Sequence, residues 1–242
     1  MKLKYRFIKI FSLIIVLGFL MNFAVRRHND RNIDTVKIHI ENSDYIHFIT
    51  NTMVKDIVNL SSENGKKAIK IKDINISKTE SNLDSNPFIS NSNVYIDLNG
   101  SININIDQKI PVVRVKTSNE EFYLDKFGSK FPLSRNFSLP CLIATGEIGN
   151  KEFNNLVKLT QLIADDDTLK NHIVSIVKDK KNCYNFLLNI PGVYIEYGEL
   201  KNNHQKLTNL KEFYRQYLDY VGFGVYKKIS LKYDNQIVAT KR

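Results

Sequence analysis

The chain has 242 residues, and its 35 Lys and Arg against 25 Asp and Glu give a formal net charge of +10. A charge of this size can indicate a nucleic-acid partner, but residues 1–31 hold seven Lys or Arg and one Asp, a net +6, so the other 211 residues carry only +4. Because that remainder has no block of basic residues interleaved with aromatics, we expect solvated faces and no nucleic-acid binding.

The N-terminal segment has the pattern of a membrane anchor. An apolar run from Ile10 to Val25 is flanked by Lys2, Lys4, Arg6 and Lys9 before it and by Arg26, Arg27 and Arg31 after it. With Phe7 and Ile8 the run reaches about 19 residues, near the roughly 20 that span a bilayer core. We predict a cytoplasmic arm over residues 1–9, a transmembrane anchor over 10–25 and the remainder outside the cytoplasm, although the positive-inside bias is slight.

A cleaved signal peptide is the main alternative to an anchor. It needs a shorter apolar core and a small-x-small cleavage site. No such site is clear, because Asn22-Phe23-Ala24 has a large residue in the middle and arginines close behind.

The next region, residues 33–108, has the element order β-α-α-β-β. Its predicted elements are a strand at Ile33–Ile40, a helix at Phe48–Leu60 with Asn51 as N-cap, a loop at 61–67, a mostly extended segment at 69–76, a short helix from Thr79 to Leu83, and two strands at Val94–Leu98 and Ser101–Gln108. Asn99-Gly100 predicts a two-residue hairpin turn between those strands. Ile110-Pro111 marks the boundary of this unit.

Residues 110–242 are predicted to form a mixed α/β domain with an antiparallel sheet. Strands are expected at Val112–Lys116, Glu121–Asp125, Lys130–Leu133, His172–Val177, Cys183–Leu188, Gly192–Tyr197, Lys228–Tyr233 and Ile237–Thr240, and amphipathic helices at Glu152–Ala164 and Leu207–Val221, with Gly222 as C-cap. The whole chain is therefore of the α+β class, with a single N-terminal transmembrane helix.

Catalytic and metal-binding motifs are missing from the sequence. It contains no Gly-x-Ser-x-Gly, Gly-rich phosphate loop, His-Glu-x-x-His or Cys-x-x-Cys. We expect no enzyme activity, cofactor, metal or small-molecule substrate, and we interpret Asp165-Asp166-Asp167 as a solvated turn at a helix exit. Cys141 and Cys183 are equally compatible with a disulfide in an oxidising compartment and with two free thiols.

Short motifs along the chain carry a resemblance to a known family. They are Glu80-x-x-Leu83-x-x-Asn86-Pro87-Phe88-Ile89, Gln108-Lys109-x-Pro111-x-x-Arg114, Phe122-Tyr123-Leu124-Asp125-x-x-Gly128, Pro132-Leu133-Ser134 and Ile229-x-Leu231-Lys232-Tyr233. The β-α-α-β-β unit resembles a polypeptide-transport-associated (POTRA) domain, and the motifs in this order resemble the FtsQ/DivIB cell-division family, particularly its Bacteroidota-type members. That family usually has Arg in place of Lys109 and Asp in place of Asn99.

The resemblance implies a scaffold of the bacterial divisome. Such a protein crosses the inner membrane once at the septum, and its periplasmic part binds FtsB, which pairs with FtsL, and helps control septal peptidoglycan synthases. The implied binding region is the last part of the chain, where a strand at a sheet edge can receive a partner strand. The residues concerned are Lys232, Tyr233, Ile229, Leu231 and Ile237. Lys232 would meet an acidic residue, while Tyr233 either contacts the partner or, being in phase with Ile229 and Leu231, packs in the core.

Two other functions remain open. One is a different POTRA-bearing protein of envelope assembly or secretion, although such proteins need a C-terminal barrel of alternating strands that this sequence does not supply. The other is a cleaved periplasmic enzyme of unknown class, which a mature N-terminus after Ala24 would favour.

Overall fold

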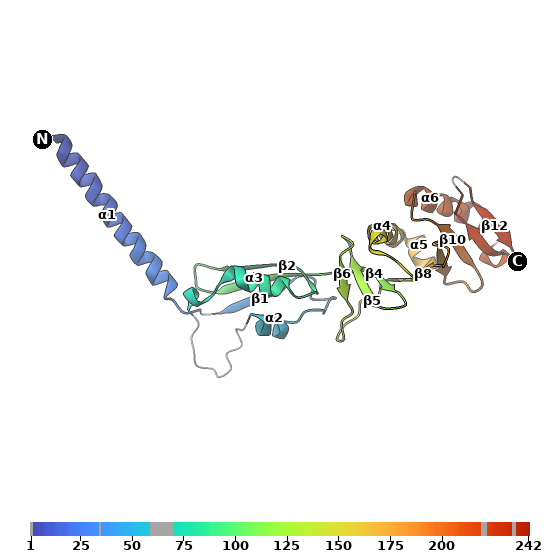
Figure 1. Ribbon diagram of the computed structural model, residues 1–242, viewed down its shortest axis with the longest axis horizontal. Helices are drawn as coiled ribbons and strands as arrows, with labels where there is room; N and C mark the ends of the chain where they lie inside the picture. The colour runs from blue at the N-terminus through green and yellow to red at the C-terminus, as the bar shows by residue number, and fades with distance from the viewer. Residues whose placement is uncertain (1, 34, 59–69, 219–221, 234–235) are drawn as a thin grey trace. The chain divides into compact units, whose positions relative to one another are not determined.

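The structure is a computed structural model that describes residues 2–33, 35–58, 70–218, 222–233 and 236–242. The chain forms two compact units, Met1–Gln108 and Lys109–Arg242 (Figure 1). The first unit begins with α1 (Lys2–Asn29). Within the described residues, the segment Ile10–Arg27 of this helix is the one stretch long and apolar enough to cross a membrane.

The rest of the first unit is a three-stranded sheet with two helices. Its elements are β1 (Val36–Ile40), α2 (Asn51–Ile57), the 3-10 turn η1 (Ile71–Asp73), α3 (Ile76–Asp84), β2 (Ile89–Ile96) and β3 (Ile102–Gln108). The strand order is β1-β3-β2, with β3 parallel to β1 and antiparallel to β2. The predicted β-α-α-β-β order is therefore confirmed.

The alternation of β3 produces the core of this unit. Ile102, Ile104 and Ile106 are buried together with Val94 of β2 and Leu83 of α3. Because side chains of a strand alternate between faces, the asparagines between these isoleucines point to the other face of the sheet. The sequence pattern predicts this arrangement because it depends only on local periodicity.

Several local details differ from the prediction. The β2–β3 connection is a three-residue loop, since Asp97 N donates to Ser101 O and Gly100 N donates to Asp97 O. The Asp97 carboxylate also accepts from the amides of Asn99 and Ser101 at 3.0 and 2.9 Å, and Gly100 has a φ of +86°. The side chain of Asp97 thus selects a longer loop than the Asn-Gly dipeptide alone indicates.

The N-caps of α2 and α3 also differ from the predicted residues. Thr50, not Asn51, caps α2 by accepting from Met53 N at 3.3 Å. Asn75, not Thr79, caps α3 by accepting from Lys78 N at 3.0 Å. Part of the segment predicted as extended is the 3-10 turn η1, and the predicted loop at 61–67 lies outside the described residues.

The second unit is built on one nine-stranded sheet. Its strands are β4 (Pro111–Lys116), β5 (Glu121–Asp125), β6 (Lys130–Pro132), β7 (Leu142–Thr145), β8 (Ile173–Lys178), β9 (Tyr184–Leu188), β10 (Tyr194–Gly198), β11 (Tyr226–Ser230) and β12 (Val238–Lys241). Its order is β12-β11-β10-β9-β8-β7-β4-β5-β6. The pairs β4–β7, β7–β8 and β10–β11 are parallel, so the α+β class is confirmed but the sheet is mixed, not antiparallel.

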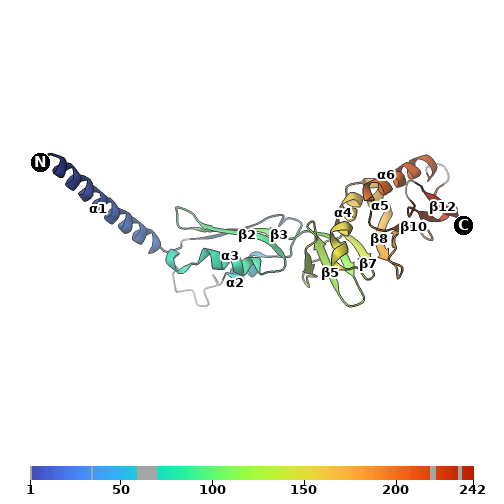
Figure 2. The same ribbon diagram turned by 45° about the horizontal axis from the view of Figure 1, so that its top comes forward.

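Helices cover one side of this sheet. They are α4 (Phe153–Ala164), α5 (Asp167–His172) and α6 (Asn203–Phe213). The 3-10 turn η2 (Asn150–Glu152) precedes α4, the π-helical turn η3 (Tyr214–Leu218) continues α6, and the 3-10 turn η4 (Phe223–Val225) precedes β11. Figure 1 and Figure 2 show α4, α5 and α6 on the same side of the sheet. Leu156 and Leu210 pack there into one core with Phe186 and Ile229.

The sequence did not predict β7 and α5, because both are short. Asp166 caps α5 by accepting from Leu169 N at 3.1 Å and pairs with Lys211 at 2.9 Å. The three consecutive aspartates therefore join α4 to a second helix and do not form a simple exit turn. The predicted C-cap Gly222 has a φ of +71°, while residues 219–221 before it lie outside the described residues.

Gln108 ties β3 to the loop after β1. Its side chain is buried, and Nε2 donates to Ile46 O at 2.9 Å and Glu41 O at 3.2 Å, while Oε1 accepts from Ile49 N at 3.0 Å. One side chain thus satisfies three backbone groups that have little access to water. Buried backbone groups left without partners cost free energy.

We therefore expect Gln108→Leu to lower the free energy of unfolding by about 2–4 kcal/mol, because it leaves these backbone groups unpaired while keeping the side-chain volume. Urea denaturation of residues 33–242 measures this loss. The matched control is Asn105→Leu on the same strand, which should change stability by less than about 0.5 kcal/mol. Equal stabilities of the two variants would show that Gln108 does not hold this loop.

Candidate functional site

The C-terminal end of the sheet is its open edge. β12 pairs with β11 on one side, and among the strands that the structure describes none lies on its other side. The backbone N–H of Arg242 donates to the carbonyl of Val225, the residue just before β11, at 3.1 Å, so this group of Arg242 is directed toward β11. Because backbone groups alternate in direction along a strand, the N–H and C=O groups of Ala239 and Lys241 are directed away from β11. Among the described residues, none bonds to these outward groups.

The structure separates the five predicted partner-binding residues. Ile229 and Leu231 are buried in the core under the helices, and Ile237 is partly buried against the same core. Lys232 and Tyr233 are exposed, Tyr233 at 55%. The strand β11 ends at Ser230 and is an interior strand. The side chains of Ile229 and Leu231 are therefore core residues, and the alternative that Tyr233 packs in the core is wrong.

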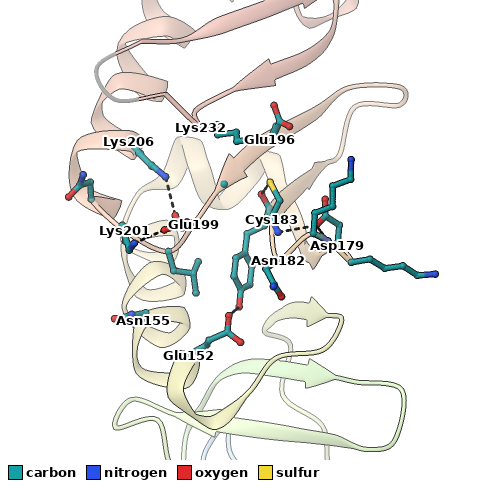
Figure 3. A pocket seen from close by; sticks show the side chains of 16 residues that line it. Glu152, Asn155, Asp179, Asn182, Cys183, Glu196, Glu199, Lys201, Lys206 and Lys232 are labelled. Carbon is teal, nitrogen blue, oxygen red and sulfur yellow. Dashed lines mark hydrogen bonds and ion pairs between the residues drawn. The ribbon is translucent and has the colours of Figure 1, made fainter.

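Lys232 borders a broad polar cleft of about 1290 Å³ (Figure 3). Figure 3 shows Glu152 at one end of the cleft, Glu196 and Lys232 at the other, and Cys183 between them. Gly198 has a φ of +85°, and a Cβ built there would lie 3.4 Å from the Lys232 Cα. Glycine at 198 thus lets the chain at Lys232 pass close to β10. Tyr233 borders a separate, smaller hollow beside α6.

A charged cluster fixes β10 to β11 next to this cleft. Glu196 Oε2 accepts from Ser230 Oγ at 2.8 Å and pairs with Lys228 Nζ at 3.3 Å. The Ser230 hydroxyl, followed by Lys228 and Lys232, holds the pKa of the Glu196 carboxyl below its usual value in spite of partial burial. The carboxylate therefore stays ionised at neutral pH and orients the end of β11 that leads to Lys232.

A second cluster fixes the first turn of α4 to the sheet. Glu152 accepts from Lys178 Nζ at 2.7 Å, from Tyr184 OH at 2.8 Å and from Gly149 N at 3.0 Å. The Lys178 side chain is only 8% exposed, and its Nζ also donates to Glu147 O at 2.7 Å. Burial raises the pKa of the Glu152 carboxyl, but these three bonds outweigh it, so that its pKa is lowered.

The titratable groups in the cleft do not favour nucleophilic chemistry. Burial raises the pKa of the Cys183 thiol, and burial together with the bond to Glu152 raises the pKa of the Tyr184 phenol. Both groups therefore stay protonated at neutral pH, and a protonated thiol is a poor nucleophile. No group of three or more metal-ligating side chains comes together in the part of the chain that the structure describes.

Both cysteines are free thiols in this structure. Cys141 precedes β7 and Cys183 precedes β9, and β8 lies between these strands. Strands are about 4.8 Å apart, so two strand spacings exceed the Cα separation that a disulfide allows. Burial raises the pKa of Cys141 to about 11, with Arg114 opposing it.

Comparison with known families matches both units. Residues 110–240 match the family described as FtsQ/DivIB, C-terminal related, and residues 33–107 match the POTRA-like domain. A comparison with curated proteins finds no match. The two family matches define a division-related scaffold with a POTRA-like domain, and its N-terminal helix is long and apolar enough to cross a membrane once.

The chain belongs to the FtsQ/DivIB, C-terminal related family, whose match covers residues 110–240. The resemblance noted in the sequence is thereby confirmed. The sequence did not single out Ala239 and Lys241, because nothing in one strand's pattern tells an edge strand from its interior neighbour. The only sequence signal for this edge strand was the short strand predicted at Ile237–Thr240 near the C-terminus.

We expect Glu152→Gln to lower the free energy of unfolding at pH 7 by about 1–3 kcal/mol, because the nearly buried Lys178 loses its anionic partner. Since the folded-state pKa of Glu152 lies below its usual 4.5, its contribution is complete above pH 4.5 and disappears as the pH falls through the folded value. Denaturation of both proteins between pH 7 and pH 3 measures this. A difference in stability that persists unchanged at pH 3 would contradict the assigned role of the carboxylate.

Proposed function

We propose that this protein is a bitopic scaffold of the divisome that binds the FtsB–FtsL pair outside the cytoplasm through the open edge of β12. Its anchor lies in the inner membrane with the N-terminus inside, and its periplasmic part acts at the division septum. By holding FtsB–FtsL it helps control the septal peptidoglycan synthases. The family match supports the division role, and the observation that carries the binding mode is the unpaired edge of β12.

The two edges of the nine-stranded sheet differ in a way that favours β12. At the other edge, β6 has three residues and ends at Pro132, which has no N–H to donate. Lys130 of β6 is held by an ion pair with Glu120. Short strands, prolines and lysines are the usual devices that keep an edge from pairing. β12 also contains a lysine, Lys241, but it is one residue longer than β6 and has no proline. Each of its residues therefore keeps its backbone N–H, which makes it the edge better suited to a partner strand.

Side chains beside this edge supply specificity. Lys232 and Tyr233 are exposed just before the chain turns into β12. The ammonium of Lys232 fits an acidic partner residue, and the phenol ring of Tyr233 provides an amphipathic contact of the kind common at interfaces. Strand addition of this sort takes affinity from backbone bonds and specificity from neighbouring side chains.

Ala239→Pro tests the backbone pairing directly. Proline there removes an outward N–H and leaves the β11–β12 bonds in place, and proline is tolerated at sheet edges. We expect residues 33–242 with Ala239→Pro to remain folded and to lose at least tenfold in affinity for purified FtsB–FtsL ectodomains, about 1.4 kcal/mol. The matched control Ala239→Val keeps the N–H and should bind normally. Equal binding of both variants would show that β12 does not pair with the partner.

Lys232→Glu and Tyr233→Ala test the side chains. Each should weaken binding by about 1–3 kcal/mol, the range for losing a charge-assisted or buried contact. Calorimetric titration beside a thermal melt separates binding from folding, which matters because Lys232 lies near Glu196. Lys158→Glu, on the exposed face of α4, is the charge-matched control. If the two variants bind as tightly as the control, the binding surface lies elsewhere.

A fluorescent protein fused to the N-terminus tests the division role in cells. The scaffold should gather in a band at midcell before constriction, because its partners are assembled there. The Ala239→Pro fusion should give a weaker band at equal expression. Uniform envelope fluorescence of the unmodified chain throughout the cell cycle would contradict the proposed function.

A further inference from the structure

The chain leaves α1 and enters the POTRA-like domain without a free linker. Ile71 N donates to Arg31 O at 3.0 Å, and Asn32 forms a β-bridge with Lys70. The Asp30 carboxylate pairs with Lys72 at 2.7 Å and with Lys70 at 3.6 Å. The residues that follow the apolar helix are therefore fixed to the 70–72 segment of the domain.

Arg31 also holds the tip of the β2–β3 hairpin. Its guanidinium donates to Leu98 O and to Asn99 O, both at 3.2 Å. The Leu98 side chain is 90% exposed, more than any other large apolar side chain among the described residues. At this exposure the described residues cover almost none of the Leu98 side chain, so it is available to a partner from outside the unit.

The length of α1 places this tip at a membrane surface. Ile10–Arg27 spans 18 residues, or about 27 Å at 1.5 Å per residue, close to the roughly 30 Å of a hydrocarbon core. Arg31 follows four residues later and so falls within the headgroup layer, which is about 5–7 Å thick on each side. Since Arg31 bonds to the Leu98 carbonyl, Leu98 lies in the same layer.

The charges around the tip fit a lipid surface. Arg26, Arg27 and Arg31 are exposed there, and Lys70 and Lys72 adjoin them. The acidic Asp30 is already paired with both lysines, and Asp97, next to Leu98, is paired with Lys37 at 3.6 Å and accepts from the amides of the loop. A predominantly basic rim around one exposed leucine is complementary to phosphate headgroups above an acyl layer.

We propose that the β2–β3 hairpin tip is a second membrane contact, in which Leu98 inserts between phospholipid headgroups and the rim of Arg31 and Lys72 binds their phosphates. It holds the POTRA-like domain against the leaflet in which α1 ends. This inference rests on the part of the proposed function that treats α1 as a retained anchor. It gives the POTRA-like domain a fixed orientation relative to the bilayer.

The absence of tryptophan from the sequence allows a direct test. The full chain with Leu98→Trp is reconstituted in vesicles of phosphatidylcholine and phosphatidylglycerol, with or without bromine at the upper acyl carbons. The single tryptophan should emit at shorter wavelength than in water and lose most of its intensity in brominated vesicles. Emission at the aqueous wavelength without quenching would overturn the proposal.

Two matched variants make the outcome decisive. Tyr45→Trp replaces an exposed ring at the opposite end of the sheet, near the Ile46 carbonyl that Gln108 holds, and should stay aqueous and unquenched. Phe19→Trp lies within the apolar segment and should be strongly quenched. If Phe19→Trp is quenched and Leu98→Trp is not, the anchor stands and the hairpin contact is wrong. If neither is quenched, the anchor is wrong and the hairpin contact falls with it.

Discussion

An open β-sheet always leaves a row of backbone groups unpaired at each edge, and this constraint governs the second unit. The nine strands run from β6 to β12, and each edge must be blunted, covered or used. β6 is short and ends at Pro132, whereas β12 keeps the outward groups of Ala239 and Lys241. The proposed binding mode rests on this difference, because β12 keeps the backbone donors that a partner strand needs.

The contacts next to that edge fix the residues on either side of β12. Glu196 joins β10 to β11 through Ser230 and Lys228, and Arg242 is held by the Val225 and Pro191 carbonyls. The strand before β12 and the residue after it are thus both fixed. A partner strand that meets a fixed edge loses less free energy in ordering the protein, which is the benefit of preorganisation.

The same logic applies at the membrane end of the chain. Arg31 and Asp30 connect the last turn of α1 to the hairpin and to the 70–72 segment. We propose that α1 is a retained anchor. Direct bonding between its end and the POTRA-like domain then holds that domain at a defined distance from the bilayer.

Local periodicity predicted much of the fold but little of the site. The alternation of Ile102, Ile104 and Ile106 correctly identified β3, because a strand with one buried face has an apolar residue at every second position. The family resemblance placed Ile229 and Leu231 in the binding site, although they are core residues of an interior strand. Which strands pair, and in which direction, depends on contacts between distant segments, so the mixed sheet and its true edge appeared only in the structure.

The central claim is that β12 extends its sheet with a partner strand. Hydrogen exchange of the backbone amides, measured residue by residue by NMR on residues 33–242 with and without FtsB–FtsL ectodomains, tests it most directly. The account predicts that the outward amides of Ala239 and Lys241 exchange freely alone and become protected in the complex, while those of β6 do not change. Unchanged exchange at Ala239 and Lys241 in a saturated complex would contradict it.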